Sequence, residues 1–305
     1  MDLGFTNVHA LVTGASGGIG ACITKLLLQH GARVTAQYHS KLGPLSELVK
    51  QFPNNLNTVS ADVTDEASVR DLFAAAGQRW NQEVQVIILS HGRWFKTSED
   101  LVDMDFTQWN LTISVYLNGA FLVTREFLKN LRSPRPGYAP DLSKVAVVLI
   151  GSTCGDFGDE DHLDYACVSS ALQIGFIRSL KHQIVRIAPA GRVNAVSPGW
   201  VNTESAKKIF EDKALQRRTL AATPLNRIAE PEDVANQVLV LASSIASRHV
   251  TGTNVLIAGG IDGYVPPDPP DYVPKPKPEE QKTGTYGETA IGLFHRTLWG
   301  KDSRR

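Results

Sequence analysis

The stretch Thr13-Gly14-Ala15-Ser16-Gly17-Gly18-Ile19-Gly20 decides the fold that this sequence predicts. It closes a β-branched apolar run, Val8–Thr13, and a helical pattern begins within it. In that context Gly14 permits a tight turn, and Gly18 and Gly20 allow backbone to approach a pyrophosphate and a helix to pack on a strand. The helix N-terminus presents unpaired N–H groups and a positive dipole end. The stretch therefore predicts a nucleotide-phosphate site, in which we include Ser16 and Ile19.

Further along the chain, short apolar runs alternate with longer helical patterns. Several runs lack polar alternation, which is typical of strands covered on both faces. Helices are predicted over Gly18–His30, from Thr64 to Trp80, and from Pro231 onward. This order predicts an α/β fold, a Rossmann-type doubly wound parallel sheet of about seven strands with helices on both faces. The predicted strands are Val8–Thr13, Arg33–Tyr38, Asn57–Ser60, Val86–Leu89, Val145–Ile150, Arg192–Val196 and Asn254–Ile257.

Composition and charge exclude several function classes. The chain has 305 residues, of which 42% are hydrophobic and 20% charged, as expected of a globular protein. Basic and acidic residues each number 31, so no net charge attracts nucleic acid or an anionic membrane. Neither a secretory signal nor a run of about 18 apolar residues is found, so we expect a cytoplasmic protein without a membrane span.

The chain contains three cysteines, Cys22, Cys154 and Cys167. They are sparse and form no CxxC pair, so neither a disulfide framework nor a zinc site is expected. We predict no metal site and interpret all three as reduced thiols without a nucleophilic role.

The composition changes after Gly263. Residues 264–278 contain seven prolines and predict an extended segment. We therefore divide the chain into one domain over residues 1–263 and a Pro-rich linker and tail over 264–305. The tail ends in an apolar stretch that includes Phe294 and Trp299. It is interpreted either as a disordered end or as a segment that docks on its own domain or on a second subunit.

The end of the second strand carries the ribose selectivity of such a site. An acid there binds the 2′-hydroxyl of NAD, but this chain has Gln37-Tyr38-His39-Ser40-Lys41. A basic, hydroxyl-bearing turn with His39 and Ser40 suits a 2′-phosphate, so NADP(H) is preferred over NAD(H). Asp62 and Val63, after the third strand, are expected to reach the adenine side.

Residues 6 to 263 resemble the short-chain dehydrogenase/reductase family. The TGxxxGxG pattern is Thr13, Gly14, Gly18 and Gly20, and further matches are Pro224–Ala235, Thr251-Gly252 and Gly259-Gly260. The resemblance implies hydride transfer between a nicotinamide and a carbonyl or alcohol. It also implies the residues of the site. Tyr165 would exchange the proton and Ser152 would orient the substrate oxygen, whereas the cofactor would contact Ser90, Gly92, Pro198, Gly199, Val201 and Thr203.

Three family signatures differ in this chain. The family has a lysine four residues after the tyrosine, where this sequence has Ser169. Tyr116 occupies the place of the asparagine on the long helix, and Ser90-His91-Gly92 keeps only the glycine of Asn-Ala-Gly. Because no ammonium lowers the pKa of Tyr165, we expect the loss to harm oxidation more than reduction.

Replacement residues are available near the predicted site. His91 is interpreted as a residue packed beside the cofactor or as part of a new proton relay. Tyr116 is interpreted as a space-filling aromatic or as a relay group. Between Ser152 and Tyr165 lie five carboxylates in nine residues, including Asp156, Asp159 and Asp164. They predict either a cationic substrate or a solvated acidic loop.

The sequence therefore predicts an NADP-dependent oxidoreductase that reduces a carbonyl or an imine of a small molecule. Two alternatives stay open: a non-redox isomerase or cyclase that retains the cofactor, and a non-catalytic NADP(H)-binding protein. The resemblance further implies a homodimer or homotetramer assembled through helices over about residues 107–131 and 164–186. The loops 93–106 and 203–222 are expected to set substrate specificity.

Overall fold

The computed structural model describes residues 2–92 and 100–263. Its described part forms a seven-stranded parallel sheet in the order β3-β2-β1-β4-β5-β6-β7. This arrangement confirms the predicted doubly wound sheet. The strands are β1 (His9–Thr13), β2 (Arg33–Tyr38), β3 (Leu56–Ser60), β4 (Val86–Leu89), β5 (Ala146–Ile150), β6 (Arg192–Pro198) and β7 (Asn254–Ile257).

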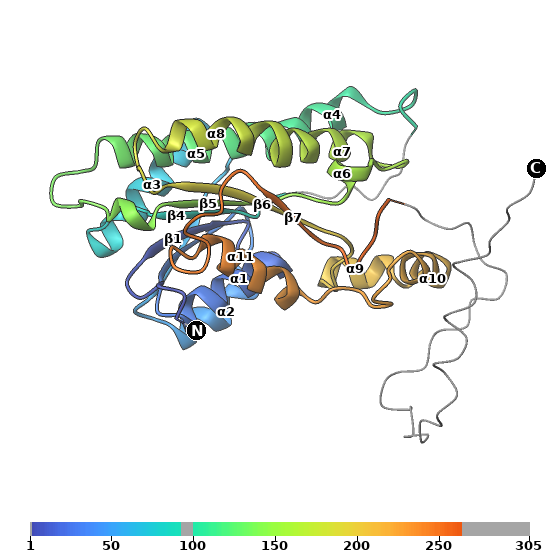
Figure 1. Ribbon diagram of the computed structural model, residues 1–305, viewed down its shortest axis with the longest axis horizontal. Helices are drawn as coiled ribbons and strands as arrows, with labels where there is room; N and C mark the ends of the chain where they lie inside the picture. The colour runs from blue at the N-terminus through green and yellow to red at the C-terminus, as the bar shows by residue number, and fades with distance from the viewer. Residues whose placement is uncertain (1, 93–99, 264–305) are drawn as a thin grey trace, which may run out of the picture. The chain divides into compact units, whose positions relative to one another are not determined.

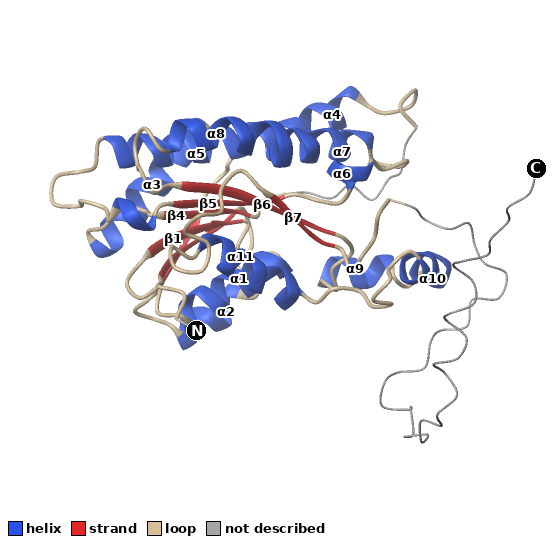
Figure 2. Cartoon of the chain, in the orientation of Figure 1, coloured by secondary structure: helices blue, strands red, loops and turns tan. Residues whose placement is uncertain are grey.

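Helices cover both faces of this sheet, as Figures 1 and 2 show. One layer contains α1, α2 and α11, and the opposite layer contains α3, α5 and α8. The helices are α1 (Gly18–Gln29), α2 (Leu45–Gln51), α3 (Glu66–Trp80), α4 (Phe106–Ile113), α5 (Gly119–Arg132), α6 (Cys154–Phe157), α7 (Leu163–Ser170), α8 (Ile177–Ile184), α9 (Glu204–Ile209), α10 (Lys213–Ala221) and α11 (Pro231–Ala242), with a 3-10 turn at Leu142–Lys144.

The apolar strands bury both of their faces, which is why they read as continuous hydrophobic runs. All residues of β1 and β4 are buried. Successive residues of β1 point to opposite faces of the sheet. Val12 packs in the hydrophobic cluster beneath α1 and α11, and Leu11 packs in the cluster beneath α3 and α5. Because burial on both faces fixes the strand register, the carboxyl ends of these strands are held firmly in place.

The strand order reverses between β1 and its neighbour β4, since β2 and β3 extend the sheet to the other side. In open α/β sheets, ligands bind outside the carboxyl ends of the strands at this switch point. The glycine turn Gly14–Gly17 lies there, directly between β1 and α1. The topology thus positions the phosphate site that the sequence predicts.

Each of the two long predicted helices is interrupted by a π-helical segment. Ser114–Asn118, called η1, joins α4 to α5, and Ala171–Phe176, called η3, joins α7 to α8. A π segment leaves backbone carbonyls out of the α-helical pattern and often marks a functional site. Here η1 carries Tyr116, and η3 follows the helix that carries Tyr165.

Some expectations concern residues outside the described ranges. The tail 264–305 and the first seven residues of the loop 93–106 belong to these. Among the residues that are described, no helix is both long enough and apolar enough to cross a bilayer.

Candidate active site

A cleft of about 620 Å³ lies at the carboxyl ends of the central strands. The structure brings most of the predicted site residues together in its wall. These are Gly14, Ser16, Gly18, Ile19, Gly20, Ser90, His91, Gly92, Tyr116, Ser152, Asp159, Tyr165, Pro198, Gly199, Val201 and Thr203. Both halves of the predicted chemistry, nucleotide binding and proton transfer, therefore face one space.

The glycine turn forms the phosphate end of this cleft. Gly14 has a φ of +61°, and a Cβ added there would lie 2.6 Å from the carbonyl oxygen of Ser90. A Cβ at Gly20 would lie 2.4 Å from the carbonyl oxygen of Gly14. The N-terminus of α1 has no side-chain cap and no acidic residue in its first turn. Its open N–H groups and dipole fit a dinucleotide pyrophosphate.

Gln37 fixes the shape of this turn, a role that the sequence analysis missed. Its Oε1 atom accepts a hydrogen bond from Gly14 N at 2.8 Å, and its Nε2 atom donates to the carbonyl of Ala61 at 2.7 Å. The side chain is 2% exposed. The available signal was a long polar residue near the carboxyl end of β2, the strand that pairs with β1.

The predicted ribose and adenine contacts lie away from the cleft wall. His39 and Ser40 are exposed, and the Nε2 atom of His39 is 3.9 Å from the Oδ2 atom of Asp62. Hydrogen bonds from Thr64 hold the pKa of Asp62 below its usual value. Val63 is buried, and its side chain packs in the core beneath α5 rather than facing the cleft.

Ser152 and Tyr165 form the proposed proton-transfer pair. Ser152 follows β5, and its Oγ atom accepts a hydrogen bond from Cys154 N at 3.2 Å. The Tyr165 hydroxyl is hydrogen-bonded to Ser152 and to Ser169. Burial, followed by the Cys154 thiol, raises the pKa of Tyr165 to about 12 despite these hydrogen bonds. Tyr165 is therefore protonated at neutral pH and is equipped to donate.

Ser169, at the position of the family's lysine, is 2% exposed and is not part of the cleft wall. Its hydroxyl contacts Tyr165 instead of open space. This geometry gives Ser169 a role in holding the tyrosine, but no direct path to a ribose.

Tyr116 belongs to η1, and its side chain lines the cleft. Its ring packs edge-on against that of Tyr165, with centroids 5.3 Å apart and planes at 62°. Its hydroxyl oxygen lies 2.7 Å from the position that a Cβ of Gly92 would take. The Tyr116 ring therefore forms an aromatic wall beside the Tyr165 ring, and only glycine at position 92 leaves room for it.

His91 links the glycine turn to η1. Its Nδ1 atom is 2.7 Å from the Oγ1 atom of Thr13, and the ring also hydrogen-bonds to the backbone of Tyr116 and Val115. Burial lowers the pKa of His91 to about 4. A carbonyl acceptor requires a ring N–H, so the neutral ring bridges β1 and the π segment. This arrangement favours a packing role over a proton relay.

Of the three predicted acidic-loop residues, Asp159 lines the cleft. Its Oδ2 atom accepts from the Cys154 thiol at 3.1 Å, and its Oδ1 atom is 3.2 Å from His162 Nδ1. Although burial raises the pKa of Asp159, hydrogen bonds from His162 and Cys154 lower it below its usual value overall. A carboxylate thus remains charged beside Tyr165. Burial also raises the pKa of Cys154 to about 12, so its thiol is no nucleophile.

The other two acids bond to other elements of the fold, although Asp164 is buried and Asp156 is exposed. Asp164 is 2% exposed and accepts hydrogen bonds from Thr112 Oγ1 at 2.6 Å and from Tyr165 N at 2.8 Å. Asp156 is bonded to the side chains of Gln173 and Asn254. Both therefore connect elements of the fold, and neither contributes to the cleft wall.

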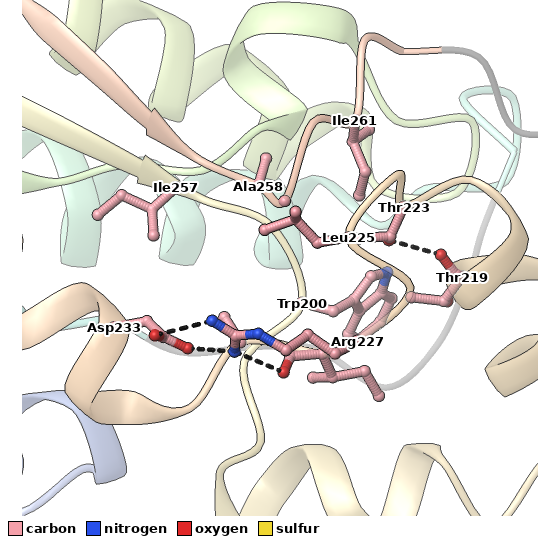
Figure 3. Close-up of a pocket in the computed structure, with 12 residues that line it drawn as sticks. Trp200, Thr219, Thr223, Leu225, Arg227, Asp233, Ile257, Ala258 and Ile261 are labelled. Atoms are coloured by element: carbon pink, nitrogen blue, oxygen red, sulfur yellow. Dashed lines mark hydrogen bonds and ion pairs between the residues drawn. The ribbon is translucent and has the colours of Figure 1, made fainter. Parts of the chain in front are cut away.

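A second, smaller cavity of about 200 Å³ lies beside Trp200 and the end of β7 (Figure 3). Leu225, Ile257 and Ile261 contribute apolar surface. The nearby Arg227 guanidinium is paired with Asp233, whose Oδ1 atom accepts a hydrogen bond at 3.0 Å. The charge of Arg227 is thus balanced within the domain.

Comparison with known proteins places this site in a family. Residues 14–262 match the family model described as enoyl-(acyl carrier protein) reductase. The 3-oxoacyl-[acyl-carrier-protein] reductase FabG of Thermotoga maritima is 32% identical over 257 residues, which cover 82% of this chain and 96% of that protein. The nodulation protein G of a Rhizobium species is 31% identical over 263 residues, covering 84% and 97%.

Solved structures show the same fold. A short-chain dehydrogenase/reductase of Brucella melitensis, titled a glucose/ribitol dehydrogenase, superposes with a TM-score of 0.74 at 25% identity and covers 86% of this chain and 99% of its own. A short-chain type dehydrogenase/reductase of Mycobacterium ulcerans reaches 0.75 at 22% identity, covering 84% and 90%. The glycine turn, the parallel sheet and the matched relatives agree. The chain belongs to the short-chain dehydrogenase/reductase family of oxidoreductases.

Proposed function

We propose that this protein is an NADPH-dependent reductase of a carbonyl or imine group on a small molecule. The observation that carries the proposal is the position of Tyr165 and Ser152 together in the wall of the cleft that begins at the glycine turn. A proton donor and an oxygen-orienting hydroxyl beside a dinucleotide site are what such a reduction requires.

The glycine turn and the N-terminus of α1 would hold the pyrophosphate of NADPH, and the bound cofactor would supply the hydride to the carbon of the C=O or C=N group, whose π pair moves onto oxygen or nitrogen. Tyr165 would donate its hydroxyl proton to that oxygen, or to the nitrogen of a neutral imine, whereas an iminium already carries this proton. Ser152 would hold the oxygen or nitrogen by a hydrogen bond. Ser169 keeps the Tyr165 hydroxyl in place from the buried side. Bulk solvent then restores the proton to Tyr165.

The proposed direction of the reaction follows from Ser169, which stands where the resembled family has a lysine. With a pKa of about 12, Tyr165 carries its proton near neutral pH and can donate it. It is a poor base at this pH, because little phenolate is present. Alcohol oxidation needs that base, whereas reduction does not. We therefore propose that reduction is the faster direction at pH 7.

The cofactor preference is proposed from the second strand. No acid follows β2 to bind a ribose 2′-hydroxyl, and the exposed His39 and Ser40 offer donors to a 2′-phosphate. The proposal predicts tighter binding of NADPH than of NADH.

Asp159 favours a particular kind of substrate, a protonated imine or another cation. It lies in the same wall as Tyr165 and carries a negative charge. An iminium carbon accepts hydride readily, and the carboxylate would stabilise the cation in the cleft. Asp159→Asn is expected to lower kcat/KM for a cyclic imine about tenfold or more, and to spare a neutral ketone of the same shape.

The first experiment is a calorimetric titration with NADPH and, in parallel, with NADH. Turnover is then followed with NADPH deuterated at nicotinamide C4, using 3-oxoacyl thioesters, suggested by the relatives' name, and cyclic imines. Deuterium in a reduced product supports the reductase. An unlabelled product would support the non-redox alternative, and binding without any product would support the NADP(H)-binding alternative.

The assembly into a homodimer or homotetramer remains a prediction from family membership. The long helices carry exposed apolar residues such as Phe121 and Leu163, which suit such an interface. Light scattering of the purified protein tests the prediction, and a monomer at all concentrations would contradict it.

A further inference from the structure

Ser152 follows β5 at a point where the pairing with β4 has ended but the backbone bonds to β6 continue. Gly151 N donates to the carbonyl of Val196 at 2.8 Å, and Thr153 N donates to that of Pro198 at 3.0 Å, so this segment continues alongside β6. In a parallel sheet, alternate residues of a strand bond to opposite neighbours. The N–H and C=O of Ser152 therefore point away from β6, toward the side of β4. The pairing of β4 with β5 has already ended at Leu149.

The carboxamide of Gln173 takes the place of the missing strand. Its Oε1 atom accepts a hydrogen bond from Ser152 N at 3.0 Å, and its Nε2 atom donates to Ser152 O at 3.1 Å. Gln173 is 1% exposed and lies in the π segment η3. One side chain thus bonds to both backbone groups of the proposed substrate-orienting residue, and Ser152 O also accepts from Gly155 N at 3.0 Å.

Neighbouring glycines make this contact sterically possible. A Cβ at Gly151 would lie 2.1 Å from Oε1 of Gln173, and a Cβ at Gly155 would lie 2.6 Å from its Nε2. Any larger residue at either position would push the carboxamide away from Ser152. The approach is therefore a specific feature of this chain and not an incidental contact.

Asp156 fixes which end of the carboxamide faces which group. Its Oδ2 atom accepts the second N–H of Gln173 Nε2 at 2.7 Å, and it also accepts from Asn254 Nδ2 on β7 at 3.1 Å through Oδ1. A carboxylate accepts and never donates, so the NH₂ end must face it and Oε1 must face Ser152 N. Asn254 in turn accepts from Ser197 Oγ at 2.9 Å, which anchors the network to β6.

We propose that Gln173, oriented by Asp156, is a positioning residue that holds Ser152 for its contact with the substrate oxygen or nitrogen. The inference rests on the proposed reductase function for its catalytic consequence. Gln173 does not line the cleft and touches no substrate, so it acts only through Ser152. Displacement of an orienting group by about 1 Å costs up to about 100-fold in rate.

The test compares Gln173→Met with Gln85→Met. Gln85 is a matched control, since it is 3% exposed and its carboxamide makes three hydrogen bonds, to His9 N, Gln82 and Asp141 O, at the opposite end of the sheet. We expect Gln173→Met to lower kcat for NADPH-dependent reduction about 10- to 100-fold with an unchanged Kd for NADPH. Gln85→Met should lower Tm comparably and leave kcat unchanged.

A rescue variant separates positioning from general damage. Gln173→Glu keeps an acceptor for Ser152 N but places a carboxylate against Asp156 and against the carbonyl of Ser152. Adding Asp156→Asn restores the hydrogen bond between residues 173 and 156 with donor and acceptor exchanged, whereas Ser152 O still lacks its donor from residue 173. We expect the double variant to recover part of the kcat lost in Gln173→Glu. Equal loss of kcat in Gln173→Met and Gln85→Met would overturn the proposal, and no recovery in the double variant would overturn the orienting role of Asp156.

A second readout does not need turnover. Hydrogen exchange of the Ser152 amide should accelerate about tenfold or more in Gln173→Met, because its acceptor is gone, and should be unchanged in Gln85→Met. If the wild type proves inactive as a reductase while this exchange still responds, the proposed function fails and the positioning of Ser152 stands. Unchanged exchange at Ser152 would refute the positioning itself.

Discussion

The glycine turn between β1 and α1 and the region around Tyr165 differ in how closely they follow the family pattern that the sequence resembles. The turn keeps Gly14, Gly18 and Gly20, and the structure shows why, since any Cβ at Gly14 or Gly20 would collide with backbone. Around Tyr165 the lysine and asparagine positions hold Ser169 and Tyr116. Both still contact Tyr165, one by a hydrogen bond and one by its ring.

The two regions are under different physical constraints. At the turn the constraint comes from the backbone itself, so no other side chain fits. Around Tyr165 it comes from side-chain chemistry, which a different residue can replace while the helices stay packed. A site of this kind can therefore retain its nucleotide cradle while its proton-transfer chemistry changes.

The largest effect is expected from the tyrosine itself. Tyr165→Phe should lower kcat for reduction about 100-fold or more, because the proposed proton donor is removed. Tyr116→Phe is the matched comparison, since it retains the ring contact and loses only a hydroxyl. Steady-state rates with NADPH give the result. A similar loss of kcat in both variants would make Tyr116 part of the proton path.

The next effect concerns the turn. Gly14→Ala forces a Cβ to within 2.6 Å of backbone at a positive φ, so it should lower the free energy of unfolding by about 2 kcal/mol or more and weaken NADPH binding. Gly137→Ala controls for φ, which is +82° there with no atom within 4 Å of the added Cβ. Urea denaturation and calorimetry measure both. Equal effects would mean that backbone conformation alone, without the close contact, preserves Gly14.

His91 connects the two regions, and its burial predicts a pH dependence of stability. Its pKa is about 4 in the folded protein and 6.5 ordinarily, so the unfolded state binds more protons between these values. The stabilisation is complete above pH 6.5 and is lost as the pH falls toward 4. Between pH 7.5 and 5.0 it should cost about 2 kcal/mol of unfolding free energy.

Urea denaturation at both pH values checks this expectation. His91→Gln should reduce the pH dependence, whereas His30→Gln, on an exposed ring, should leave it as in the wild type. A His91→Gln protein with the full dependence would assign the effect to other groups, first of all to the buried His9, whose pKa burial also lowers to about 4.

The smallest effect is expected at the ribose end. His39→Asp should weaken NADPH binding about fivefold or less and strengthen NADH binding, because the side chain is 74% exposed and its charge is screened by water. Calorimetry with both cofactors gives the ratio. Lys41→Ala serves as a control for the general loss of positive charge in this turn. An unchanged ratio in His39→Asp would remove this residue from the proposed 2′-phosphate contact.

Much of the fold was determined by the sequence alone. Apolar runs without alternation predicted the parallel strands, and a glycine-rich turn between strand and helix predicted the nucleotide end of the cleft. These patterns are readable because each arises from local physics, namely strand burial on both faces and the space a Cβ needs. The placement of Ser152 and Tyr165 in one site, like their roles, came from the family resemblance.

Only the tertiary structure decided which polar residues face the cleft. Asp156 and Asp164 have partners far along the chain, Asn254 and Thr112. Asp159 bonds to its neighbours Cys154 and His162 and lines the cleft. Gln37 and Gln173 serve the site from buried positions, through hydrogen bonds that span 23 and 21 residues. Hydrogen-bond partners of this kind are set by how distant segments pack, and no local pattern encodes them.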